Sequence, residues 1–269
     1  MKISYKIIGL IVLALSIVSC EKVIDLPLNE AEQKFVIEAV TSDFANDNYI
    51  LISKTGTVYE QSVFEKVNNA VITVTDKNGI VTNFTEDGTN SGRYVNPAFL
   101  VTENNDYLLN VKIGTEEFTS KYSTQSKAVL DFIFTEKYAQ SSSNGTPVDS
   151  INLVYFAFTD NINETNYYRF KVFKNGKYTN QLYLGDDKLI NGEQFVNLFF
   201  ADEFDSGDTV LVEMQNIDKA NYTYFYSMSN AQSTSPFSAT PANPVSNIEG
   251  GALGYYGAYL KDTMSLIVP

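Results

Sequence analysis

Short segments of alternating apolar and polar residues, separated by turn residues, run through the first half of the chain. They fall at 35–40, 49–52, 70–75, 80–84, 107–113 and 116–122. A period of two is typical of half-buried β-strands, because successive side chains point to opposite faces of a sheet. Asn78-Gly79 predicts a hairpin, since both residues tolerate positive φ, and Gly114-Thr115 predicts a second. This spacing predicts a β-sandwich over residues 34–125.

The second half also consists of predicted short strands, but their spacing differs from that of the strands in the first half, so we find no internal repeat. Strands are predicted at 128–135, 151–159, 167–173, 177–184, 195–200, 209–215, 253–259 and 264–268, with a turn at Asn175-Gly176. One helix is predicted near 218–232: Asp218 is suited to cap it, and Tyr222, Phe225 and Met228 recur at helical spacing. Residues 126–269 are therefore expected to form a β-rich C-terminal domain with one helix.

The first twenty residues have the pattern of a bacterial lipoprotein signal peptide. Lys2 and Lys6 precede a twelve-residue, mostly apolar run at 7–18, and small Ser19 stands directly before Cys20, the only cysteine. A membrane-spanning helix needs about 20 apolar residues, so a permanent span is disfavoured. The alternative is an ordinary secretory signal with a chance cysteine. We predict a signal peptide at 1–19, a lipid on Cys20, and a tether at 20–33.

The predicted fold class follows from these segments. It is mainly β, with two β-sandwich-like domains in tandem, the second carrying one short helix, after a lipoprotein signal peptide. With Lys2 and Lys6 removed, 17 basic residues stand against 32 acidic ones. Nucleic acid is not expected as a partner, because phosphate binding needs clustered positive charge. The membrane contact is expected to be the lipid on Cys20.

The absence of histidine limits the chemistry of the chain. With no histidine and one cysteine, expected to carry lipid, a Ser-His-Asp triad, a Cys-His pair and the ordinary zinc sites are excluded. Paired carboxylates remain available for glycoside hydrolysis, but the chain has 32 acidic residues, and the sequence does not identify a particular pair among them. Asp202, Asp205 and Asp208 are weak candidates for a metal site, and a plain turn before 209–212 is the favoured interpretation. No cofactor is expected.

Four tyrosines are candidate binding residues. Tyr222, Tyr226, Tyr255 and Tyr256 belong to two aromatic clusters that suit a stacking platform or an interface. Alternating or helical spacing equally suits core packing. The lack of tryptophan weakens the case for a sugar platform.

Several short motifs resemble one family across nearly the whole chain after Cys20. They are 19–26 (Ser-Cys-Glu-Lys-Val-Ile-Asp-Leu), 35–38, 166–170, 207–210, 247–251 and 254–259. In these the chain resembles the Bacteroidota outer-membrane lipoproteins grouped as domain-of-unknown-function family 4249. Residues 70–113, with the step Gly92-Arg93-Tyr94, resemble the carboxypeptidase regulatory-like, prealbumin-type (Ig-like) β-sandwich.

The family resemblance implies association with TonB-dependent outer-membrane receptors and a role in nutrient uptake, with no catalytic residues to carry over. We therefore expect a non-enzymatic, outer-membrane-anchored accessory protein that binds an unidentified small ligand or assists such a receptor. The alternatives are a surface glycan hydrolase with paired carboxylates, and a structural or adhesive surface module.

Overall fold

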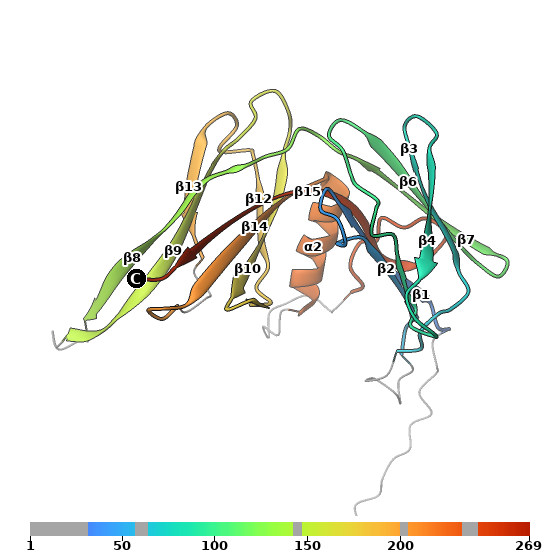
Figure 1. Cartoon of the computed structure of the whole chain (residues 1–269), viewed down its shortest axis with the longest axis horizontal. Coiled ribbons are helices and arrows are strands. Elements are labelled where there is room, and N and C mark those ends of the chain that lie inside the picture. The colour runs from blue at the N-terminus through green and yellow to red at the C-terminus, as the bar shows by residue number, and fades with distance from the viewer. Residues whose placement is uncertain (1–31, 57–63, 142–146, 200–203, 233–241) are drawn as a thin grey trace, which may run out of the picture.

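The computed structural model describes residues 32–56, 64–141, 147–199, 204–232 and 242–269. Within these ranges the protein is mainly β, as predicted. Figure 1 shows an arch, in which the strands of the two halves lie on either side and helix α2 lies below their meeting point. No helix in the described ranges is long and apolar enough to cross a membrane.

The first half is a sandwich-like fold of seven strands in the described part of the chain. They are β1 (Phe35–Ser42), β2 (Tyr49–Lys54), β3 (Val71–Asp76), β4 (Val81–Glu86), β5 (Arg93–Val95), β6 (Asp106–Ile113) and β7 (Glu116–Ser123). Alternate residues of these strands point inward and form one apolar core. Its members include Ile37 and Ile50 from one side and Ile72, Leu109 and Phe118 from the other. Each fully buried side chain of this size contributes roughly 1.5–3 kcal/mol.

The second half has its own core between two groups of strands. The strands are β8 (Leu130–Ser141), β9 (Pro147–Thr159), β10 (Tyr167–Lys174), β11 (Lys177–Tyr178), β12 (Tyr183–Asp186), β13 (Gln194–Leu198), β14 (Thr209–Ile217) and β15 (Leu253–Ile267). A three-stranded sheet, β13-β9-β8, supplies Phe156 and Phe158, which pack against Phe170, Val212 and Met214 of β10 and β14.

One strand, β15, belongs to both halves. Its residues Leu253 to Tyr259 pair in parallel with β1, and its residues Leu260 to Ile267 pair antiparallel with β14. One twelve-stranded sheet therefore runs through the molecule in the order β11-β10-β14-β15-β1-β2-β5-β4-β3-β6-β7, with β12 beside β10. The domain boundary expected between residues 125 and 126 stays a prediction, but the end of the chain completes the first core.

Both Asn-Gly hairpins are present, with different turns. At Asn175-Gly176 both residues have positive φ, 51° and 76°, as a two-residue type I′ turn requires. In the first hairpin only Gly79 has positive φ. The carboxylate of Asp76 accepts the backbone N–H groups of Asn78 and Ile80 at 2.9 and 2.8 Å, which stabilises this longer turn.

Helix α2 (Lys219–Gln232) confirms the predicted helix and its cap. Asp218 Oδ1 accepts the backbone N–H of Asn221 at 2.7 Å, satisfying one of the free donors of the first turn. Two other predictions need correction. The strand predicted at 177–184 is two short strands, separated where Asn180 has a φ of 61°, and the strands predicted at 253–259 and 264–268 are one continuous strand.

Candidate functional site

Helix α2 carries a partly exposed stack of tyrosine rings beside strand β10. Tyr222 and Tyr226 are one helical turn apart, and their rings lie parallel, with centroids 6.2 Å apart and planes at 6°. The ring of Tyr167 on β10 lies 5.1 Å from that of Tyr222. Tyr226 is 55% exposed. Two of the four tyrosines predicted as binding residues therefore form one surface stack.

The other two predicted tyrosines are buried on opposite faces of β15. Tyr255 lies under α2, with its ring centroid 4.8 Å from that of Tyr224 and 5.0 Å from that of Phe225. Tyr256 points into the first core, where its ring lies 6.1 Å from that of Tyr122. Burial raises the pKa of both hydroxyls. The structure thus separates this pair from the surface stack, and their role in binding stays a prediction.

A buried arginine lies beneath α2, and the sequence analysis did not single it out as a site residue. The guanidinium carbon of Arg169 is 4.0 Å from the ring centroid of Phe225, and the residue is 9% exposed. Such a cation–π contact is stronger when it is desolvated. The side chain of Asn221 donates to the carbonyl of Tyr256 at 2.7 Å and accepts from the hydroxyl of Tyr259 at 2.9 Å. These contacts fix the helix against the sheet.

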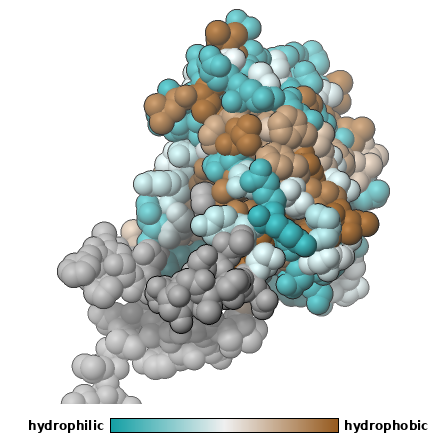
Figure 2. All heavy atoms as spheres, turned by 90° about the vertical axis from the view of Figure 1, so that its left-hand side faces the viewer, coloured by the Kyte–Doolittle hydropathy of each residue, from teal (hydrophilic) through white to brown (hydrophobic). Residues whose placement is uncertain are grey.

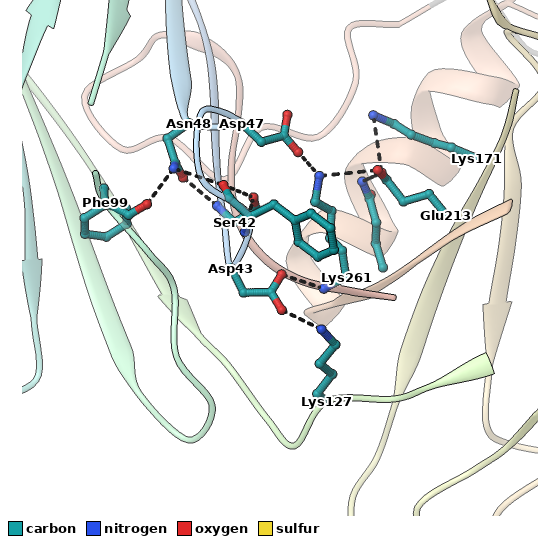
Figure 3. A network of polar contacts seen from close by, with 11 residues as sticks. Ser42, Asp43, Asp47, Asn48, Phe99, Lys127, Lys171, Glu213 and Lys261 are labelled. Atoms are coloured by element: carbon teal, nitrogen blue, oxygen red, sulfur yellow. Dashed lines mark hydrogen bonds and ion pairs between the residues drawn. The ribbon is translucent and has the colours of Figure 1, made fainter. Parts of the chain in front are cut away.

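A network of ion pairs joins the turn after β1 to the second half of the molecule (Figure 3). The amine of Lys261 contacts the carboxylates of Asp47 and Glu213, the latter at 3.3 Å, and its side chain is 4% exposed. The backbone N–H of Lys261 donates to Asp43 at 2.9 Å, and Lys127 donates to the same carboxylate at 2.7 Å. Burial lowers the pKa of Lys261 to about 8.

The turn that supplies these carboxylates is itself held by side chains. Asn48 accepts from the backbone N–H of Ser42 at 2.8 Å and donates to the carbonyl of Phe99 at 2.6 Å. The amines of Lys127 and Lys261 lie 5.5 and 5.3 Å from the ring centroid of Phe44. The network therefore joins the two halves through ion pairs and hydrogen bonds, and we call it the joint.

Removing the amine of Lys261 tests this joint. Unfolded lysine keeps its proton up to about pH 10.5, whereas the folded group loses it near pH 8, so stability should rise by about 2 kcal/mol between pH 7 and 9.5. In Lys261→Met this rise should disappear, because the variant has no amine that can lose a proton between pH 7 and 9.5. Urea unfolding of both proteins at several pH values measures the difference. Lys188→Met, at a side chain that is 73% exposed, is the control and should keep the rise; a variant at Lys261 that kept it would contradict the assignment.

The acidic segment predicted as a weak metal candidate is a turn in its described part. Asp202 lies outside the described residues. Asp208 accepts the backbone N–H of Asp205 at 2.8 Å and pairs with the amine of Lys174 at 2.8 Å. The hydrogen bond from Lys174 lowers the pKa of Asp208 to about 2. The lysine amine thus occupies the position that a cation would take, and the described residues contain no group of three or more possible metal ligands.

An apolar surface covers the outer face of the β13-β9-β8 sheet, and we call it the outer aromatic face. The rings of Phe134 and Tyr155 stack with centroids 4.8 Å apart, and that of Phe132 lies 5.8 Å from Phe134. Phe132 is 42% exposed, Val196 47% and Tyr138 59%. Figure 2, which views the molecule from the side of this sheet, shows apolar side chains gathered among polar ones. Large contiguous apolar patches on a protein surface are typical of interaction sites.

The fold and these surfaces define a mainly β protein of two sandwich-like halves that share one strand. A model of the family described as Domain of unknown function (DUF4249) matches residues 21–265. Because this match covers most of the chain, the protein belongs to that family. No protein with a curated description matches the chain.

Proposed function

We propose that this protein is a lipid-anchored, non-enzymatic protein of the outer membrane that acts as an accessory or ligand-binding partner of a TonB-dependent uptake receptor. The observation that carries the proposal is the position of Cys20. It follows the apolar run 7–18 and Ser19, and the family match begins at the next residue, Glu21. A domain that starts directly after the cysteine fits a mature protein whose first residue carries the lipid.

Three further features support the role of partner protein. The outer aromatic face offers a sheet surface with aromatic side chains, the residue types that most often anchor protein interfaces. The resemblance of several motifs to Bacteroidota lipoproteins, and of residues 70–113 to a prealbumin-type sandwich, supports an envelope module that binds rather than catalyses. The joint around Lys261 holds the two halves as one body that can present this face to a receptor.

The proposal is tested by purifying the tagged full chain from native membranes in mild detergent. A large β-barrel receptor should co-purify with it, and mass spectrometry should find a lipid on Cys20. Cys20→Ser should lose the lipid and leave the membrane fraction, while the control Ser19→Ala, which keeps a small residue before the cysteine, should retain both. An unmodified Cys20 in the wild type would contradict the anchor.

The receptor contact is tested separately with matched substitutions. Val196→Ser on the outer aromatic face should reduce receptor recovery about tenfold, because an apolar interface contact is lost. Val81→Ser, at a residue of the first half that is 57% exposed, is the matched control and should leave recovery unchanged. Equal recovery with both variants would exclude this face, and repeated absence of any barrel protein would overturn the partnership.

A further inference from the structure

A cavity of about 360 Å³ opens between the two layers of the second half, apart from the surfaces described above. Its walls come from β9 and β13 on one side and from β10 and β12 on the other, and the segment between β12 and β13 forms its rim. The volume is more than twice the roughly 150 Å³ of a cavity that holds benzene. It lies within the range of roughly 300–1,000 Å³ that is typical of small-molecule sites.

The walls are preformed by packed aromatic rings. The ring of Phe156 lies 4.4 Å from that of Phe170, and the ring of Phe158 lies 4.7 Å from that of Tyr168 and 5.8 Å from that of Phe195. These rings also belong to the second core and are held by it. A ligand would therefore meet rigid apolar walls, and little conformational entropy would be lost on binding.

Gly185 leaves part of this space empty. It lines the cavity from β12, on the same face as Tyr183, whose ring packs into the second core 4.9 Å from that of Phe199. Its φ is not positive, and a Cβ added there would meet nothing within 4 Å. Among the glycines whose surroundings the structure describes, Gly185 alone combines these two properties. Neither the backbone nor crowding requires glycine at this position, so its effect is to keep the cavity open.

The rim sets the polarity of the ligand. Among the described residues that line the cavity, Asp186 is the only charged one, and Asn197 adds a carboxamide. None of the described lining residues is basic, and the amine of the neighbouring Lys188 is paired with Asp186 at 2.5 Å, so an anion would have to compete with that carboxylate and would lose its hydration at a cost. Leu189 at the rim is 96% exposed, and a ligand would cover it.

Hydrogen bonds hold the rim segment at both of its ends. The backbone N–H of Gly192 donates to Asp160 at 3.0 Å, and Asp187 accepts the backbone N–H of Asn166 at 2.7 Å. The mouth is therefore held by buried polar contacts, as expected for a built site.

We propose that this cavity binds an uncharged, mainly apolar small molecule that contains two or three fused or linked rings. The inference deepens the ligand-binding part of the proposed function and rests on that function only for the biological use of the ligand.

The test uses the chain from Glu21 onward, which contains both cores whole, and the uncharged fluorescent probe N-phenyl-1-naphthylamine. Wild type should bind the probe saturably, with enhanced emission. In the series Gly185→Ala, Gly185→Val and Gly185→Leu the affinity should fall stepwise, by about tenfold or more for Leu, as the added side chains fill the space. The melting temperature should stay equal or rise, because β-propensity increases and a void is filled. Val81→Phe, which adds a ring at a 57% exposed position of the first half, is the control and should bind the probe as wild type does.

Two results would overturn the proposal: no saturable emission with wild type, or unchanged affinity in a folded Gly185→Leu. The charge assignment is tested with the sulfonated analogue 1-anilinonaphthalene-8-sulfonate, which should bind at least roughly tenfold more weakly; equal affinity would show that the site accepts anions. Because none of these variants touches Cys20 and the assay holds no receptor, a failure here is distinguishable from a failure of the membrane experiment.

Discussion

Raising the pH above 10 is expected to unfold the protein cooperatively. Burial raises the pKa of several tyrosines of the described chain, and the shift is largest for six of them: Tyr224 to about 12, and Tyr122, Tyr168, Tyr255, Tyr256 and Tyr259 higher still. The unfolded chain ionises these hydroxyls near pH 10 while the folded chain keeps them protonated, so stability falls as pH rises. Each group costs about 1.4 kcal/mol per pH unit above 10, and six together cost about 8 kcal/mol at pH 11. This is comparable with the total stability of a typical domain, roughly 5–15 kcal/mol.

The measurement is a titration followed by tyrosinate absorbance and by circular dichroism. The buried tyrosines should ionise only in the step in which the β-sheet signal is lost. Tyr256→Phe removes one buried hydroxyl and should raise the midpoint of that step, whereas Tyr226→Phe removes an exposed one and should leave it unchanged. Smooth ionisation of all tyrosines near pH 10 with intact dichroism would contradict the expectation.

Much of the fold could be predicted from local pattern, because many strands have one buried and one exposed face. In β6, for example, the inward residues Tyr107, Leu109 and Val111 alternate with more exposed ones. The helix could be predicted from Asp218 and the spacing of its aromatic residues, because a cap and a helical face are local features. The fold class and the one helix followed from such signals.

Long-range pairing could not be predicted in this way. The sequence analysis predicted two strands with Lys261 and Asp262 between them, yet β15 continues through both residues. Their partners make this possible: Lys261 contacts Glu213, and Asp262 accepts the backbone N–H of Leu130 at 2.8 Å. The parallel pairing of β15 with β1 joins residues more than two hundred positions apart, as in Gly254 with Ile37, and no local period encodes such a partner.

The candidate site was predictable only by residue type. The sequence pattern singled out four tyrosines, but the exposure of each one depends on tertiary packing. Helix α2 covers one face of β15, and the first core covers the other. That tertiary arrangement leaves Tyr226 at the surface and buries Tyr256 completely. The cavity was missed for a similar reason. Its wall residues resemble ordinary core residues in sequence. Gly185, the residue that indicates the cavity most clearly, can be interpreted only when the empty space beside it is known.

Replacing Gly254 with alanine should destabilise the protein by about 4 kcal/mol or more. Gly254 has a φ of 102°, and a Cβ there would lie 2.1 Å from the carbonyl oxygen of Ile37 on the neighbouring strand. Relief would require displacing β1 from β15, the strand that both halves share, so the loss should extend to the whole fold. Gly251, three residues earlier, is the matched control: its φ is 92°, but a Cβ would meet nothing within 4 Å. Gly251→Ala should therefore show the backbone strain alone, about 1–3 kcal/mol. Urea unfolding of both variants measures the difference, and equal losses would mean that the close approach of β1 to Gly254 contributes nothing beyond the strained φ.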